Sequence, residues 1–204
     1  DNVIFKGKFK KNIKKNKNSI NKTLAILREK NFIKKKPKYK IIVKKNIPVF
    51  SGLGGGSSNA ASIIRYFMKG KKISKTNINF FSKKIGSDLK LFFMSKKIFQ
   101  KNLTTIEHYK KDYNFYFLVV FPFFKGSSKE IYSRLRKFDF IKNKNEYKKN
   151  SRSKLIRALQ LSKNSLEKIV ISKYPKVRKI LEEMRLIKNS QLSRVTGSGS
   201  ACFA

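Results

Sequence analysis

The segment from Pro48 to Ala61 constrains the fold and the function of this chain more than any other. It reads Pro-Val-Phe-Ser-Gly-Leu-Gly-Gly-Gly-Ser-Ser-Asn-Ala-Ala, with four glycines in five positions. Glycine permits backbone conformations of positive φ and lets ligand oxygens approach main-chain N–H groups without an intervening side chain. The β-forming residues at 39–43 precede the segment, and an apolar helical period follows over 57–68. These patterns predict a strand, a glycine loop and a helix.

A helix that begins directly after such a loop favours phosphate as the ligand. Its first N–H groups have no partner within the helix, and they lie at the positive end of the helix dipole. Ser57 and Ser58 add hydroxyls for phosphate oxygens or magnesium. The loop is not a Walker A loop, because no Gly-Lys-Ser/Thr closes it, and it lacks the G-x-G-x-x-G spacing of a dinucleotide fold. The simpler alternative is a hinge or a helix-capping turn without a ligand.

Composition and charge bound the class of protein. With 204 residues, 40% of them apolar, the chain can bury one large core or two modest ones, so we expect a globular protein. The formal net charge of +40 suggests a polyanionic partner such as nucleic acid or an anionic membrane. The lysines are spread along the whole chain, however, together with many Asn, Ile and Phe, which favours A/T-rich coding over a selected binding site. We expect no nucleic-acid and no membrane partner, and a basic nucleic-acid-binding protein remains the alternative.

Cysteine and histidine usage excludes several kinds of site. Cys202 is the single cysteine, so no internal disulfide can form, and this usage fits a reducing cytoplasm. His108 is the single histidine and is expected at the surface, which excludes Ser-His-Asp, Cys-His and His-rich zinc schemes within this chain. We expect no metal site built from the protein alone. No apolar run approaches the roughly 18 residues that span a bilayer, and no signal-peptide pattern is present, so we expect a cytoplasmic protein.

Hydrophobic periodicity predicts the remaining elements. Helices are expected over 19–30, behind a capping Ser19, and over 76–84, 127–137, 153–161, 164–172 and 174–187. We expect a strand over 114–121, a loop over 142–153, and a strand, glycine turn and strand over 192–204. Polar residues between Gln100 and Asp112 predict a domain boundary, which divides the chain into residues 1–108 and 109–204. Because the chain begins with Asp1 and ends in a strand-like sequence, we expect a fragment.

Four segments, in this order, resemble motifs of the GHMP kinases. Pro48–Ala61 is similar to the second motif of that family, and its three consecutive glycines most resemble the 4-diphosphocytidyl-2-C-methyl-D-erythritol kinases. Ile85–Phe92 is similar to their Leu-Gly-Ala-Asp-Val-Pro-Phe-Phe, and Lys125–Tyr132 to their Pro-Gly-x-Ser-Thr-x-Glu-x-Tyr. Arg194–Ala204 is similar to their closing Leu-Thr-Gly-Ser-Gly-Ser-x-Phe-Ala. The resemblance covers essentially the whole chain.

The resemblance implies an α+β fold of two domains. One is like domain 2 of ribosomal protein S5 and is truncated at its start, and the other is ferredoxin-like and is truncated at its end. The implied activity is the phosphorylation, by ATP bound as Mg-ATP, of the 2-hydroxyl of 4-diphosphocytidyl-2-C-methyl-D-erythritol in non-mevalonate isoprenoid biosynthesis. The implied enzyme is a monomer or a weak homodimer. The alternative within the family is a kinase of homoserine, mevalonate or a sugar.

The resemblance also implies roles for individual residues. Asp88 is the implied catalytic base, because an aspartate that faces a substrate hydroxyl can accept or orient its proton during phosphoryl transfer. The simpler interpretation of Asp88 is a turn cap after Gly86. For the turn over 196–200, called the closing turn below, the simpler interpretation is a hairpin whose glycines serve turn geometry. The implied ATP-binding residues are Pro48, Gly52, Leu53, Gly54, Gly55, Gly56, Ser57 and Ser58. The residues implied to lie near the substrate or the phosphates are Gly197, Ser198, Gly199 and Ser200.

The sequence departs from the family pattern in three places. Lys90 stands where the family has a proline, which predicts a different support for the Asp88 segment. The family's N-terminal Lys-Ile-Asn motif and the Tyr-His pair that stacks the cytosine are not in the chain, so a lysine that assists Asp88 is missing. We therefore expect these 204 residues alone to show little or no turnover. Asn164 resembles the asparagine of the family's Asn-Asp-Leu-Glu segment and is expected to be a structural cap.

Overall fold

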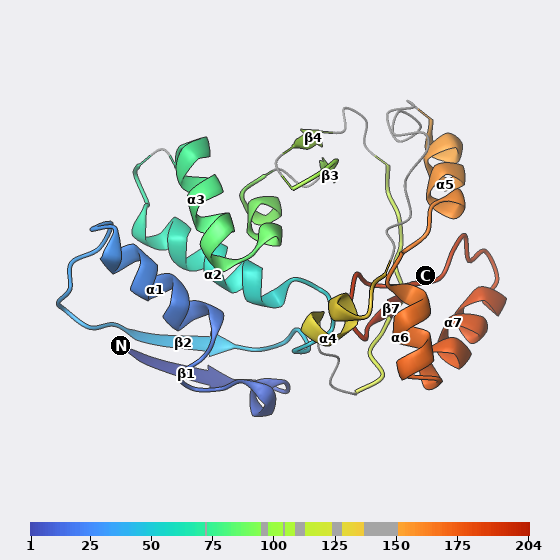
Figure 1. Cartoon of the computed structure of the whole chain (residues 1–204), viewed down its shortest axis with the longest axis horizontal. Coiled ribbons are helices and arrows are strands. Elements are labelled where there is room, and N and C mark those ends of the chain that lie inside the picture. The colour runs from blue at the N-terminus through green and yellow to red at the C-terminus, as the bar shows by residue number, and fades with distance from the viewer. Residues whose placement is uncertain (72, 95–97, 104, 109–112, 124–127, 137–150) are drawn as a thin grey trace. The chain divides into compact units, whose positions relative to one another are not determined.

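Figure 1 shows a computed structural model of the chain, in which helices and short strands are mixed. It describes residues 1–71, 73–94, 98–103, 105–108, 113–123, 128–136 and 151–204. The contacts divide the chain into two compact units. The first contains residues 1–49 and 54–108, and the second contains residues 50–53 and 109–204. The glycine-rich segment thus supplies residues to both units.

A two-stranded parallel sheet belongs to the first unit. β1 (Asn2–Lys6) pairs with β2 (Lys40–Lys44), and Val3 lies opposite Ile41. The inward side chains of both strands pack on the helices, whereas Ile42 on the other face is 56% exposed. The sequence predicted the second strand to within a residue but did not predict the first.

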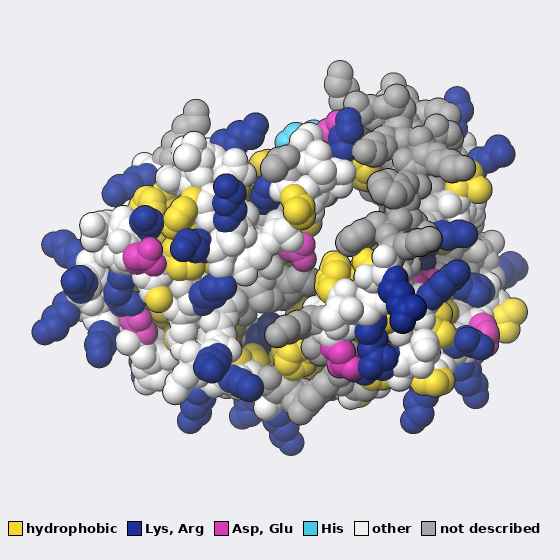
Figure 2. Space-filling view, viewed as in Figure 1, with side chains coloured by type: hydrophobic (Ala, Val, Ile, Leu, Met, Phe, Trp, Pro, Cys, Tyr) yellow, Lys and Arg dark blue, Asp and Glu magenta, His cyan; other side chains and the backbone are white. Residues whose placement is uncertain are grey.

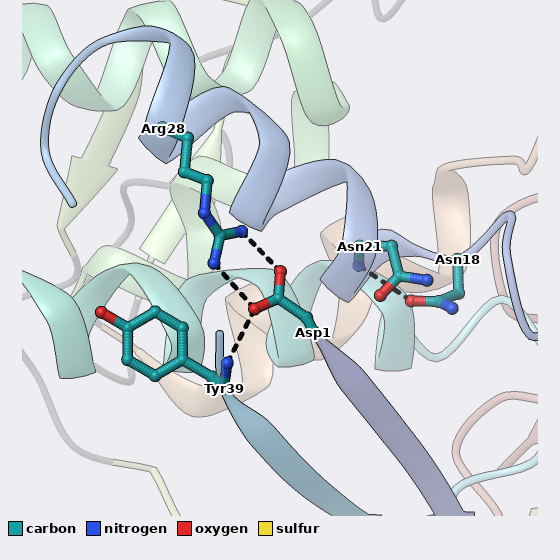
Figure 3. Close-up of polar contacts among 5 residues, drawn as sticks. All are labelled: Asp1, Asn18, Asn21, Arg28 and Tyr39. Carbon is teal, nitrogen blue, oxygen red and sulfur yellow. Dashed lines mark hydrogen bonds and ion pairs between the residues drawn. The ribbon is translucent and has the colours of Figure 1, made fainter. Parts of the chain in front are cut away.

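The first residues of the chain are fastened to the following helix (Figure 3). The Asp1 carboxylate accepts two hydrogen bonds from the Arg28 guanidinium, at 2.5 and 2.7 Å, and one from the Tyr39 backbone N–H at 2.9 Å. Arg28 lies in the last turn of α1 (Ser19–Glu29). The cap of this helix is Asn18, whose side chain accepts hydrogen bonds from the N–H groups of Ile20 and Asn21. The expected cap, Ser19, was wrong by one residue, because the Asn18 amide oxygen satisfies the first free donors instead.

Three further helices complete the core of the first unit. α2 (Gly55–Phe67) packs on α1 and on the 3₁₀ helix η2 (Ser87–Phe93), and α3 (Lys75–Ile85) packs on the same two elements. A short 3₁₀ turn, η1 (Lys10–Asn12), follows β1, and the antiparallel pair β3 (Ile98–Gln100) and β4 (Ile106–His108) ends the unit. His108 is exposed, as the sequence predicted. The fully or nearly buried core side chains are Ile20, Leu24, Leu27, Ala60, Ala61, Ile64, Phe81 and Leu89.

The second unit contains a three-stranded antiparallel sheet with β7 (Cys202–Phe203) between β5 (Val119–Val120) and β6 (Arg194–Val195). Two backbone hydrogen bonds between Leu118 and Ala204, at 2.9 and 3.0 Å, extend the pairing of β5. The strand predicted over 114–121 is therefore much shorter within the described residues. Tyr116, at 98% exposed, lies outside it.

The described part of this unit has four helices: α4 (Ser128–Ser133), α5 (Arg152–Leu161), α6 (Glu167–Lys173) and α7 (Lys176–Leu186). Of these, α6 contacts β6 and α7 contacts β7. The helix expected over 164–172 begins three residues later, because Asn164 forms a turn before it. The expected loop over 142–153 lies outside the described residues as far as 150, and its last two residues belong to α5, so the loop was predicted too long at that end. The buried core side chains are Ile131, Leu166, Val170, Val177, Leu181, Met184, Val195 and Cys202.

The face shown in Figure 2 carries Lys and Arg side chains over both units and few acidic ones. These basic side chains are scattered and do not form one stripe. Among the described helices, none has the length and apolar character of a membrane span.

Candidate active site

Helix α2 begins inside the glycine-rich segment, two residues earlier than the sequence predicted. Gly54, at φ +69°, is its N-cap and brings no side chain to it. The Gly54 carbonyl accepts the first helical hydrogen bond from the Ser58 N–H, at 2.9 Å, so three glycine and serine N–H groups precede that bond. The first turn contains no acidic residue. At the positive end of the helix dipole, the backbone therefore carries almost no side chains.

The three consecutive glycines have different surroundings. A Cβ on Gly54 would lie 2.8 Å from the Phe92 ring, so packing and a positive φ both require glycine there. A Cβ on Gly55 would lie 3.2 Å from Nζ of Lys45. A Cβ on Gly56 would meet nothing nearer than the Ser19 hydroxyl, at 3.8 Å. Packing among the described residues therefore does not require the glycine at 56.

Asp88 lies at the start of η2, which packs on α2. The neighbouring Leu89 is fully buried, and Arg65 of α2 donates a hydrogen bond to the Phe92 carbonyl at the other end of η2. Asp88 itself is exposed, and within the described residues its carboxylate accepts one hydrogen bond, from the Ser87 hydroxyl at 3.2 Å. No side chain caps η2. An exposed carboxylate thus lies beside the buried Leu89, and its other lone pairs can accept a proton.

Lys90 is accommodated by burial of its side chain. It is 7% exposed, and its ammonium group donates a hydrogen bond to the backbone carbonyl of Leu103. A proline at this position would restrict the backbone but could not reach that carbonyl. Where the family has the backbone restraint of a proline, this chain therefore has a contact from the Lys90 side chain to the loop before β4.

In the second unit, the entrance of the glycine loop is joined to the closing turn. The Ser51 carbonyl accepts hydrogen bonds from the Thr196 hydroxyl, at 2.6 Å, and from the Ala201 N–H, at 3.1 Å. The Ser200 hydroxyl donates to the Phe50 carbonyl at 3.3 Å. A Cβ on Gly199 would lie 2.2 Å from the Ser51 carbonyl group. Glycine is thus required there by the close approach of two backbones.

The closing turn is held from behind by the segment before α6. The Asn164 amide donates to the carbonyls of Val195 and Gly197, at 3.1 and 2.8 Å, and its oxygen accepts from the Leu166 N–H at 3.0 Å. The Glu167 carboxylate accepts from the Val195 N–H at 2.9 Å. The N-cap of α6 is Leu166 and no side chain caps this helix, so the expectation of a capping Asn164 was wrong. Asn164 instead forms the turn before α6, and its side chain fixes the closing turn.

Known proteins are similar to this chain over nearly its whole length. Residues 18–92 match the family model described as GHMP kinases N terminal domain. The 4-diphosphocytidyl-2-C-methyl-D-erythritol kinase of Pelagibacter ubique is 36% identical over 204 residues, which are 99% of this chain and 71% of that protein. The chain belongs to the GHMP kinase family. The protein of the same name from Thermotoga petrophila is 34% identical over 170 residues, 81% of this chain and 62% of that protein.

Solved GHMP kinase structures have the same fold, as the sequence predicted. A 4-(cytidine 5'-diphospho)-2C-methyl-D-erythritol kinase superposes with a TM-score of 0.61 at 18% identity, covering 100% of this chain and 73% of that one. Homoserine kinase from Cytophaga hutchinsonii superposes with a TM-score of 0.67 at 16% identity, covering 100% and 71%. Because kinases of two different acceptors fit similarly well, the GHMP fold does not identify the acceptor.

The two units bring together different members of the predicted GHMP site. The first contains the loop from Gly54 to Ser58 and Asp88, on elements that pack together, and it also contains Pro48. The second contains Gly52 and Leu53 with the closing turn, in which the hydroxyls of Ser198 and Ser128 lie 2.7 Å apart. In the Lys125–Tyr132 motif, residues 125–127 lie outside the described residues.

Sequence reasoning missed Lys45, the buried lysine beside Gly55. The side chain is 6% exposed. The signal was present in the alternation of the strand, because residues 41, 43 and 45 share the inward face. Among 51 basic residues, that single inward lysine did not stand out.

Proposed function

We propose that this chain forms the catalytic part of an ATP-dependent kinase that phosphorylates the 2-hydroxyl of 4-diphosphocytidyl-2-C-methyl-D-erythritol, a step of isoprenoid biosynthesis. The observation that carries the proposal is the glycine-rich start of α2, where free N–H groups and the dipole end lie beside Gly56, a glycine that packing does not require. The choice of acceptor rests on the relatives that are named 4-diphosphocytidyl-2-C-methyl-D-erythritol kinase.

The glycine loop is the proposed site of the ATP phosphates. Its N–H groups suit phosphate oxygens, and the hydroxyls of Ser57 and Ser58 suit the phosphates or the accompanying Mg²⁺. Pro48, Gly52 and Leu53 are the proposed neighbours of the nucleotide, and the closing turn at 197–200 is the proposed neighbour of substrate and phosphates. The MgATP substrate supplies the phosphoryl group.

Asp88 is the proposed catalytic base. The acceptor hydroxyl oxygen forms a bond to the γ-phosphorus, while the bond from that phosphorus to the β,γ-bridging oxygen breaks and ADP leaves. The hydroxyl proton passes to the Asp88 carboxylate, which is exposed and accepts a single hydrogen bond from Ser87 within the described residues. Fixed N–H dipoles at the start of α2 stabilise the charge on the transferring oxygens.

The test measures transfer from radiolabelled ATP to the diphosphocytidyl alcohol by the purified protein, which detects slow turnover, and ATP binding separately. Asp88→Asn should lower the transfer rate by about 100-fold or more and leave ATP binding intact. Gly56→Ala should weaken ATP binding without loss of thermal stability, because the added methyl group meets no protein atom within 3.4 Å. Glu183→Gln, on the exposed face of α7, is the control and should change neither quantity.

The outcomes distinguish a wrong acceptor from a wrong assignment as a kinase. Transfer to homoserine, mevalonate or a sugar, but not to the diphosphocytidyl alcohol, would replace the acceptor and keep the kinase. An absence of ATP binding and transfer, together with salt-sensitive RNA binding, would favour the nucleic-acid-binding alternative that the net charge of +40 raises.

We further propose that the enzyme works in the cytoplasm as a monomer or a weak homodimer, without a nucleic-acid or membrane partner. The single, buried Cys202 and the scattered basic residues support this assignment. Sedimentation at several protein concentrations measures the oligomeric state.

A further inference from the structure

Lys45 is a buried cation at the start of helix α2. It follows β2 directly, and its backbone is pinned on both sides, because its N–H donates to the Lys6 carbonyl at 2.7 Å and its carbonyl accepts from the Phe9 N–H at 3.3 Å. The side chain is 6% exposed, and its Nζ lies 3.2 Å from the position of a Cβ on Gly55. The sheet therefore directs this ammonium group to the first residue of α2.

This ammonium group has no counter-charge within the part of the chain that the structure describes. No described acidic side chain forms an ion pair with it, no described group hydrogen-bonds to Nζ, and the first turn of α2 has no acidic residue. Burial lowers the pKa of Lys45 accordingly. A buried, unpaired ammonium is costly, and here it adds to the positive end of a helix dipole. Both charges favour the same occupant, an anion.

We propose that Lys45 binds the phosphate chain of the nucleotide, together with the free N–H groups at the start of α2. This inference rests on the proposed kinase function and adds a side chain to its nucleotide site. The glycine loop supplies neutral donors, and Lys45 supplies the full positive charge that a Walker A loop would take from its own lysine. The cost of the empty site is offset when the phosphates pair with the ammonium group.

Lys45→Met tests the proposal by calorimetric titration with ATP and with inorganic triphosphate, alongside thermal unfolding without ligand. ATP binding should weaken by about tenfold or more, because a charge-assisted contact is lost, and triphosphate binding should weaken in parallel. The unliganded protein should be at least as stable as the wild type, because an unpaired buried charge is removed. A purely structural lysine predicts the opposite, a loss of stability with unchanged affinity. Lys45→Arg should retain part of the affinity.

Lys44→Met is the matched control, since Lys44 is the exposed neighbour at the end of β2 and pairs in register with Lys6. It should bind both ligands like the wild type. If the wild type binds ATP and Lys45→Met binds it equally well, the inference is wrong and the kinase proposal stands. If the wild type binds neither ATP nor triphosphate, the nucleotide site and this inference both fail.

Discussion

At the scale of single residues, glycines with similar sequence surroundings serve different purposes. A Cβ on Gly56, at the start of α2, would meet no close neighbour, and the proposed reason for this glycine is the approach of a ligand to the backbone. Gly52 and Gly199 instead lie where backbones touch, since a Cβ on Gly52 would lie 2.2 Å from the Thr196 carbonyl oxygen. A motif read from sequence cannot separate these two reasons for glycine, because each predicts the same letter.

Gly199→Ala should destabilise the protein by about 3 kcal/mol or more, because the new methyl group would lie 2.2 Å from the Ser51 carbonyl group and neither backbone can yield cheaply. Gly197→Ala is the control in the same turn. Its Cβ meets nothing within 4 Å, and it adopts φ +49°, so it should cost only about 1–2 kcal/mol. Urea unfolding of both variants measures the difference, and equal losses would show that the close contact is not the cause.

The Cys202 thiol should resist alkylation in the folded protein. Burial raises its pKa to about 11, with a further contribution from the negative charge of Glu167. The reactive species is the thiolate, so labelling at pH 8 should be about 100-fold slower than in the unfolded chain. The raised pKa of Cys202 also makes the free energy of unfolding depend on pH. The folded state holds the proton above the ordinary thiol pKa, so stability should fall as the pH rises from about 9 towards 11. Equal labelling rates in the folded and unfolded protein would contradict the burial of this thiol.

At the scale of elements, the segment before α6 fixes the closing turn. Asn164→Ala removes three hydrogen bonds and should lower the free energy of unfolding by about 1–3 kcal/mol, and it should also weaken ATP binding, because the turn at Gly197 loses its support. The control is Gln160→Ala, whose amide donates one exposed hydrogen bond to the Gln191 carbonyl at 2.8 Å. Denaturant unfolding and nucleotide titration measure both effects. Unchanged ATP binding in a destabilised Asn164→Ala protein would limit Asn164 to a structural role.

Helices were predictable because each carries its own signal. The apolar period of α1, α3 and α7 places each within two residues of its expected ends, and local capping explains the remainder. Strands were less predictable, because a strand of two to five residues is defined by its partner. β1 pairs with residues almost forty positions later, and β3 and β4 have three residues each. Their sequences alone contain too few alternations to indicate a strand.

The candidate site also has a part that the sequence predicted and a part that it did not. The glycine loop and Asp88 were predicted from motif letters, and their roles remain proposals. The contacts that organise the closing turn were not predictable, because the Thr196 hydroxyl and the Ser51 carbonyl are 145 residues apart in the sequence. The same holds for Lys90, whose partner at Leu103 could not be inferred from a substituted proline.

At the scale of the whole molecule, 51 basic residues face 11 acidic ones. Self-repulsion of a net charge of +40 should destabilise the folded state, and salt screens it. Raising sodium chloride from about 20 to about 200 mM should therefore raise the Tm by several degrees. Potassium chloride is the control and should act alike, because screening depends on ionic strength. A Tm that stays constant or falls would mean that the charges are already compensated.

The path of the chain through its two units has a practical consequence. Residues 50–53 belong with the unit that otherwise begins at Tyr109, so the backbone enters that unit twice. No single cut can release either half intact. A peptide of residues 109–204 would leave the Thr196 hydroxyl and the Ala201 amide without their acceptor at Ser51. Autonomous folding of that piece is therefore not expected, and split-protein complementation would need a donor that carries residues 50–53.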